Sequence, residues 1–176
     1  MHRFIMSGFG GQGVMSMGMM LAYAGMLEGK EVTWLPSYGP EMRGGTANCH
    51  VIVSHKPISS PIIQKATDVI AMNLPSLTKF ESFLEKNGHL FVNSSLIDVP
   101  PSRDDILGYY LKANDIAIKL KNTKVVNMVM LGAVIEKTKV VSLDSLGAVV
   151  KKMFGENKKE VIPVNLQALK EGAGLI

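Results

Sequence analysis

The chain has 176 residues, of which 47% are hydrophobic and 19% are charged, so it is long and apolar enough to fold as one domain around a core. A formal net charge of +4 and an aromatic content of 6% argue against nucleic-acid binding, which usually needs a dense basic surface with stacking aromatics. A single cysteine, Cys49, excludes an internal disulfide and a cysteine-ligated iron–sulfur cluster. With no signal pattern and no membrane-length apolar run, we expect a cytoplasmic domain spanning residues 1–176.

The first expected unit is a short apolar strand at residues 4–6, a glycine-rich turn and a helix over Val14–Leu27. Glycine permits positive φ and close backbone approach, and the start of a helix offers N–H groups with a positive dipole end. The turn is therefore suited to hold a phosphate or a carboxylate. The alternative is a tight strand–helix turn that needs glycine only for packing. The candidate residues of the turn are Gly8, Gly10, Gly11, Gln12 and Gly13.

The rest of the chain alternates between strand and helix patterns. Strands are expected at residues 30–35, 46–54, 68–72, 89–93 and 107–111. Helices are expected at 75–86, 115–120, 124–138, 143–154 and 165–171, with Asn73 and Ser142 as caps and Gly88 ending the first of them. The first two strands and their helix should form a right-handed βαβ unit. The pattern predicts a three-layer α/β/α fold whose mostly parallel sheet becomes mixed through the strand after Gly45.

The spacing Gly8-x-Gly10-x-x-Gly13 satisfies the glycine part of the dinucleotide-binding fingerprint. That fingerprint also needs an acidic residue at the end of the second strand to hold the ribose hydroxyls. The second strand ends instead in Leu35 and Pro36, and Glu31 lies at its beginning. The sequence therefore lacks the acidic residue that an NAD site needs to bind the ribose.

A second candidate loop follows the second strand. It contains Ser37, Tyr38, Gly39, Glu41, Arg43, Gly44 and Gly45. The Arg43 guanidinium beside two glycines suits a carboxylate, a phosphate or an acidic side chain of a partner, with Glu41 holding the arginine in place. The alternative is an ion-paired loop braced by glycine turns. Both loops should leave the sheet at its carboxyl end, where ligands usually bind.

No self-sufficient catalytic set is visible in the sequence. Ser7, Ser16 and Ser37 have no evident His and Asp partners, and the four histidines lack the spacing of a metal site. Asn127 is expected at the beginning of a helix, as a cap or as a brace for a loop. We therefore expect no catalytic and no metal-binding residue.

Three stretches together resemble the gamma subunit of the 2-oxoacid:ferredoxin oxidoreductases. They are Gly8-Phe9-Gly10-Gly11-Gln12-Gly13-Val14, Pro36-Ser37-Tyr38-Gly39-Pro40-Glu41-Met42-Arg43-Gly44-Gly45 and Asn127-Met128-Val129-Met130-Leu131-Gly132-Ala133. The resemblance implies a complex that cleaves a 2-oxoacid with thiamine diphosphate, passes electrons through iron–sulfur clusters to ferredoxin and captures the acyl group on coenzyme A.

The resemblance further implies that thiamine diphosphate, Mg and the clusters belong to companion alpha, beta and ferredoxin-like delta subunits, and that this chain alone is inactive. The two loops and Asn127 would contact coenzyme A or pack on those subunits. The second loop resembles that of the 2-oxoglutarate, pyruvate and branched-chain enzymes more than that of the indolepyruvate enzymes. Among these substrates 2-oxoglutarate is favoured, with pyruvate next. Two alternatives stay open: a stand-alone nucleotide-binding oxidoreductase, and a purely structural subunit whose apolar first helix is the interface.

Overall fold

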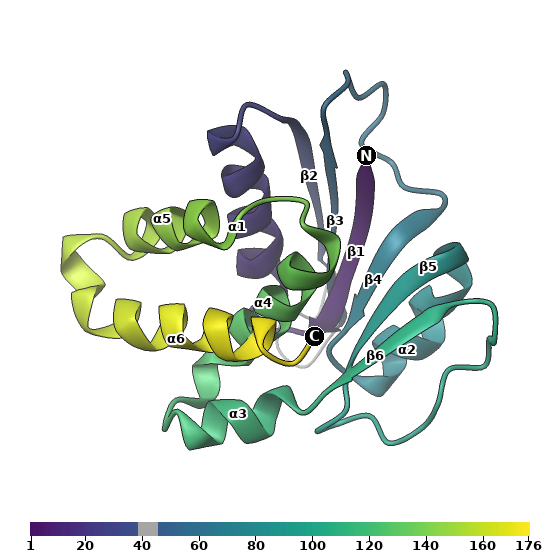
Figure 1. The fold of residues 1–176 in the computed structure, drawn as a ribbon. Coiled ribbons are helices and arrows are strands. Elements are labelled where there is room, and N and C mark those ends of the chain that lie inside the picture. Colours follow the sequence, from purple (N-terminus) through teal and green to yellow (C-terminus); the bar gives the residue numbers. More distant parts are fainter. Residues whose placement is uncertain (39–45) are drawn as a thin grey trace.

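Six strands form one sheet in the computed structural model, which describes residues 1–38 and 46–176 (Figure 1). The strands are β1 (His2–Phe9), β2 (Glu31–Tyr38), β3 (Thr46–Ser54), β4 (Ala66–Ala71), β5 (Leu84–Asn93) and β6 (Leu107–Leu111), in the order β2-β3-β1-β4-β5-β6. β3 runs antiparallel to both of its neighbours, and the pairs from β1 to β6 are parallel. The expected mixed sheet, with the strand after Gly45 as the antiparallel one, is confirmed.

Helices lie on both sides of this sheet. They are α1 (Val14–Leu27), α2 (Leu74–Phe80), α3 (Ala113–Lys119), α4 (Val126–Thr138), α5 (Leu143–Phe154) and α6 (Ile162–Ala173), with short 3₁₀ turns η1 (Glu81–Phe83), η2 (Thr123–Val125) and η3 (Glu156–Val161). α2 covers one face, and α1 and α4 cover the other with α5 and α6 packed outside them (Figure 1). Each face has its own apolar core, so the α/β fold with three layers is confirmed.

The β1–α1–β2 unit has the expected elements, but its two strands are not neighbours in the sheet. β1 and β2 are parallel, but β3 lies between them, so His50 pairs with Ile5 on one side and Leu35 on the other. As a result, the carboxyl ends of β1 and β2 flank the start of β3, where Phe9 faces Thr46 and Tyr38 faces Ala47. Both candidate loops therefore leave the sheet at the carboxyl ends of β1 and β2, as expected.

The helix expected over residues 75–86 was predicted too long, because α2 ends at Phe80 and β5 begins at Leu84. The physical reason is Arg103, far away in the sequence. Its guanidinium donates to the carbonyl oxygens of Glu81 (3.2 Å) and Leu84 (2.6 Å), and its backbone N–H donates to the Glu81 carboxylate (2.8 Å). These bonds hold the chain in a 3₁₀ turn that leads into a strand, so Gly88 lies within β5 and ends no helix.

Several other elements were predicted too short at one or both ends, among them β1, β4, β5, α3, β2 and α6. β2 continues through Pro36 to Tyr38, which is tolerated because β2 is an edge strand and proline lacks only a ladder donor. α6 begins at Ile162, and Pro163 lies in its first turn, where the fixed φ of proline is compatible with a helix. The caps were predicted correctly: Asn73 accepts from the Ser76 N–H and Ser142 from the Ser145 N–H, each at 3.0 Å.

α4 and α6 pack with their backbones in contact. A Cβ added at Gly132 would collide with the carbonyl oxygen of Leu169, and one added at Gly172 would collide with the carbonyl oxygen of Val129. Only glycine at both positions permits this close approach. The contact fixes the position of the C-terminal helix against α4.

Candidate functional site

The glycine turn connects β1 to α1 and is held by the side-chain amide of Gln12. Its Oε1 accepts from the Phe9 N–H (2.6 Å) and from Nδ2 of Asn73 (3.2 Å), and its Nε2 donates to the Met72 carbonyl (3.3 Å). Gln12 therefore ties the turn to the connection between β4 and α2. Its role in the isolated chain is to position the backbone of the turn.

The glycines of this turn serve different purposes. A Cβ at Gly8 would lie 2.6 Å from Gln12 Oε1, and one at Gly13 would lie 2.5 Å from Nδ2 of Asn127, so both positions are explained by packing. Gly11 has a φ of +94° but faces open space, with no described atom near its missing side chain. Gly10 lies in the turn itself, partly exposed. The packing alternative thus accounts for Gly8 and Gly13, and Gly11 remains open to a ligand or a partner.

The positive dipole at the start of α1 has, among the described residues, no capping side chain and no acidic residue nearby in the helix. Gly13 is the N-cap residue, with a φ of +75°, and no described side chain caps the helix there. The first turn carries no acidic residue, so the positive end of the helix dipole is not compensated within α1. Asn127, which is 7% exposed, donates from Nδ2 to the Gly13 carbonyl at 3.3 Å. As the sequence suggested, Asn127 braces the loop, and it joins the beginnings of α1 and α4.

A hollow of about 690 Å³, which we call the polar hollow, lies beside this helix start. Segments from the starts of α1, α4 and α6, the end of α5, and the turns η2 and η3 enclose it. Its ionisable side chains are Lys124, Lys158 and Glu160, and its amides are Asn122, Asn127, Asn157 and Asn165. One wall is apolar and includes Met20, Met153 and Phe154. A hollow with basic, amide and apolar groups suits a ligand that carries both an anion and an apolar ring.

The second candidate loop is placed only at its ends. Ser37 is exposed near the end of β2, and Tyr38 is the last residue of that strand. Gly39, Glu41, Arg43, Gly44 and Gly45 lie outside the described residues. The two ends of this loop lie at the same end of the sheet as the glycine turn. The expected common position of the two loops is therefore confirmed for the residues that border them.

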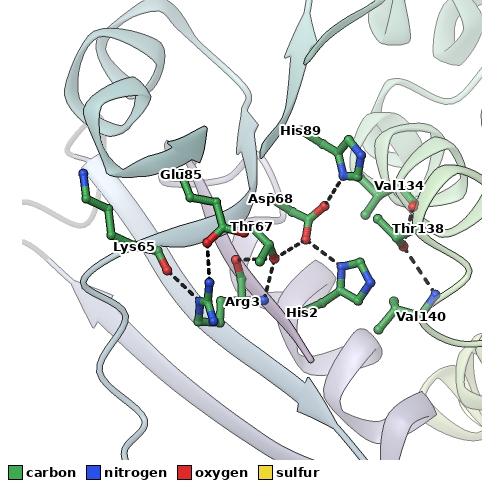
Figure 2. Close-up of polar contacts among 10 residues, drawn as sticks. All are labelled: His2, Arg3, Lys65, Thr67, Asp68, Glu85, His89, Val134, Thr138 and Val140. Carbon is green, nitrogen blue, oxygen red and sulfur yellow. Dashed lines mark hydrogen bonds and ion pairs between the residues drawn. The ribbon is translucent and has the colours of Figure 1, made fainter. Parts of the chain in front are cut away.

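A buried polar cluster, missed by the sequence analysis, lies at the opposite, amino end of the sheet (Figure 2). The fully buried carboxylate of Asp68 accepts from Nδ1 of His2 and Nδ1 of His89, each at 2.8 Å, and from the Thr67 hydroxyl at 2.5 Å. Burial by itself would raise the pKa of Asp68, but these hydrogen bonds outweigh it and the pKa is lowered. The cluster joins β1, β4 and β5. The signal that could have revealed it is one carboxylate beside an otherwise apolar strand.

Among residues 1–38 and 46–176, no three or more side chains of His, Cys, Asp or Glu are grouped so that they could hold a metal ion. In the same ranges, every helix is too short or too polar to cross a membrane. His50 lies within β3, and burial lowers its pKa.

Comparison with known proteins agrees over almost the whole chain. The family described as "Pyruvate ferredoxin/flavodoxin oxidoreductase" matches residues 3–175. Ketoisovalerate oxidoreductase subunit VorA of Methanothermobacter thermautotrophicus is 36% identical over 171 residues, which are 97% of this chain and 35% of VorA. The 2-oxoglutarate synthase subunit KorC of Methanocaldococcus jannaschii is 33% identical over 132 residues, covering 73% of this chain and 71% of KorC.

A solved structure shows the same fold. The gamma subunit of keto/oxoacid ferredoxin oxidoreductase from Geobacter sulfurreducens superposes with a TM-score of 0.85 at 25% identity, covering 99% of this chain and 98% of that one. The chain thus corresponds to nearly all of one solved gamma subunit and to about a third of VorA.

Proposed function

Because the chain belongs to the pyruvate ferredoxin/flavodoxin oxidoreductase family, we propose that it is the gamma-type component of a complex that oxidises a 2-oxoacid to its acyl-coenzyme A and reduces ferredoxin. The observation that carries this proposal is the match to oxidoreductase subunits over nearly the whole chain. The sequence match to VorA covers 97% of the chain, and the structural match to a solved gamma subunit covers 99% of it. The fingerprint for NAD stays incomplete, since β2 offers no acidic residue at its carboxyl end.

In this proposal, thiamine diphosphate, Mg and the iron–sulfur clusters are held by companion alpha, beta and ferredoxin-like delta subunits. The chemistry of this chain's own donors supports that division. Burial raises the pKa of the Cys49 thiol to about 12, so the sulfur stays protonated and is a poor ligand for iron. The chain would contribute binding surface, and the cofactors would supply the decarboxylation and the electron transfer.

We further propose that the polar hollow and the two candidate loops contact coenzyme A. Lys124 and Lys158 could pair with its phosphates, and the uncapped start of α1 would favour the same negative charge. The apolar wall with Met20 and Phe154 offers a surface for the adenine ring. Arg43 belongs to the segment between β2 and β3 and would add a guanidinium group to these contacts.

The substrate class is a 2-oxoacid, and 2-oxoglutarate is the first one to test. The competing choices are pyruvate and the branched-chain acids, and ketoisovalerate, for which VorA is named, belongs to the second group. A decisive experiment is purification of the tagged chain from its own host, followed by an assay of coenzyme A-dependent reduction of a low-potential dye with each acid. Activity with one acid in a co-purified complex supports the proposal. A chain that purifies alone with a bound dinucleotide contradicts it.

The coenzyme A contact can be tested in the purified complex. We expect Arg43→Ala and Lys124→Ala each to raise the apparent KM for coenzyme A up to about fivefold, since one charged contact is worth about 1 kcal/mol. Lys112→Ala, which removes an exposed lysine that does not line the hollow, should leave that KM unchanged. An unchanged KM for both test variants in an intact complex would favour the purely structural role.

A further inference from the structure

The outer face of α1 is apolar although it is exposed. The helix contains no charged residue over its 14 positions, whereas exposed helix faces normally carry charged side chains. Tyr23, Met26 and Leu27 are 48%, 57% and 57% exposed. Their spacing of three and four residues places them on one stripe of the helix. A contiguous apolar stripe of this kind marks a surface that another molecule covers.

Two adjoining hollows flank this stripe. The first, of about 480 Å³, lies between α1 and α5 and is lined by Tyr23, Met26, Leu27, Val149, Lys152 and Met153. The second, of about 250 Å³, lies between α1 and the edge strand β2 and is lined by Met19, Ala22, Tyr23, Met26, Val32 and Trp34. Tyr23 and Met26 line both hollows and form the ridge between them. A ridge between two grooves is the shape into which the side chains of another helix pack.

We call the stripe and its two hollows the α1 docking face. Its chemistry suits a protein partner: methionine side chains adapt to irregular apolar surfaces, and a tyrosine adds a large flat contact. Lys152 gives the face one positive charge, with Lys151 beside it in the last turn of α5, and the whole chain has a formal charge of +4. The complementary surface is therefore apolar with a carboxylate opposite Lys152.

One relative, VorA, offers a candidate for that surface. The matched region forms only 35% of VorA, so in VorA this domain is covalently continuous with nearly twice its own length of further sequence. That further sequence lies next to this domain in VorA, so it is the candidate for covering the exposed apolar face of this chain. Met153 also lines the polar hollow, so a partner seated between α1 and α5 borders the proposed coenzyme A site.

We propose that the α1 docking face binds the polypeptide that corresponds to the part of VorA beyond the matched region, through an amphipathic segment with large apolar side chains. The inference rests on the proposed function and adds the surface by which the complex is held together. The bound segment would also narrow the open side of the polar hollow, because Met153 lines both the α1 docking face and that hollow.

The test uses the tagged chain expressed in its own host. Met26→Glu and Leu27→Glu place a charge on the α1 docking face, and Ile118→Glu on α3, where the side chain is 63% exposed, is the matched control. All three changes are at exposed positions, so thermal unfolding should show folded chains. We expect both α1 variants to retain at least tenfold less of the companion oxidoreductase polypeptide, and Ile118→Glu to retain the normal amount.

Equal retention by the α1 variants and the control would overturn the proposal. So would a homodimer of the isolated chain that Met26→Glu disrupts while companion retention stays normal, since the face would then bind a second copy. If the unsubstituted chain captures no oxidoreductase polypeptide, the proposed function itself fails, and the docking proposal falls with it. That outcome is distinguishable because it appears without any substitution.

Discussion

Polar groups are paired at the amino end of the sheet, whereas some are left without a partner, among the described residues, at the carboxyl end. At the amino end, the Asp68 carboxylate is fully buried and accepts hydrogen bonds from both His2 and His89 (Figure 2). At the carboxyl end, the start of α1 has no cap among the described residues, and Gly11 faces open space. Buried polar groups stabilise a fold only when they are paired, whereas unpaired groups at the surface are available to a ligand. The amino end therefore holds the strands together, and the carboxyl end is where binding is expected.

The largest effect should come from breaking the amino end. Asp68→Asn removes the charge that both imidazoles face, and we expect a loss of about 3 kcal/mol in the free energy of unfolding, measured by urea titration. Asp105→Asn is the control, because Asp105 pairs with Arg103 in a partly exposed ion pair and should matter much less. Similar losses for the two variants would show that the buried cluster does not stabilise the fold.

An intermediate effect is expected at the carboxyl end. Gly13→Ala combines a strained φ of +75° with an overlap against Asn127, and should lower the free energy of unfolding by about 2 kcal/mol. Gly11→Ala has the same kind of strained φ but meets open space, so it should cost about 1 kcal/mol. The overlap alone then explains the difference between them. If adding Asn127→Ala to Gly13→Ala recovers none of the loss, the overlap is not its cause.

The smallest effect concerns a second polar group at the amino end, Glu28. Burial would raise its pKa, but hydrogen bonds from Lys30 (2.7 Å) and from the Ser142 N–H (2.7 Å) outweigh this and lower the pKa from 4.5 to about 2. A lowered pKa in the folded state adds stability above about pH 4.5, and that stability is lost as the pH falls towards 2. Glu28→Gln should therefore cost on the order of 1 kcal/mol at pH 6.

The pH dependence gives the check on this prediction. The difference in unfolding free energy between the unsubstituted chain and Glu28→Gln should shrink as the pH is lowered from 4.5 towards 2. A difference that stays constant over this range would mean that the carboxylate of Glu28 contributes nothing through its charge.

Local signals in the sequence were sufficient for much of the fold. The bounds of α1 and α5 follow from unbroken apolar or amphipathic runs, and the caps Asn73 and Ser142 follow from short-range chemistry. The end of α2 could not be predicted in this way. It depends on Arg103, whose hydrogen bonds to the carbonyls of Glu81 and Leu84 form only after residues about twenty positions apart have come together.

The candidate site shows the same division. The glycine turn and its place at the carboxyl end of β1 were visible in the sequence, because each follows from a local motif. A bracing role for Asn127 was one of two expectations, but its partner, the Gly13 carbonyl 114 positions earlier, is known only from the structure. The polar hollow was not, since residues between Gly13 and Asn165 from six segments enclose it. The Asp68 cluster was missed for a related reason: its three strands are brought into register by pairing, which no single stretch specifies.

The close contact of α4 and α6 has a consequence for the site. Gly132 and Gly172 let the two backbones touch, so the distance between these helices is set by main-chain atoms and cannot be adjusted by exchanging one side-chain rotamer for another. Asn127 belongs to α4 and Asn165 to α6, and both line the polar hollow. The helix pair thus acts as a rigid spacer, and a single added methyl group at either glycine would alter the dimensions of the hollow without touching any residue that lines it.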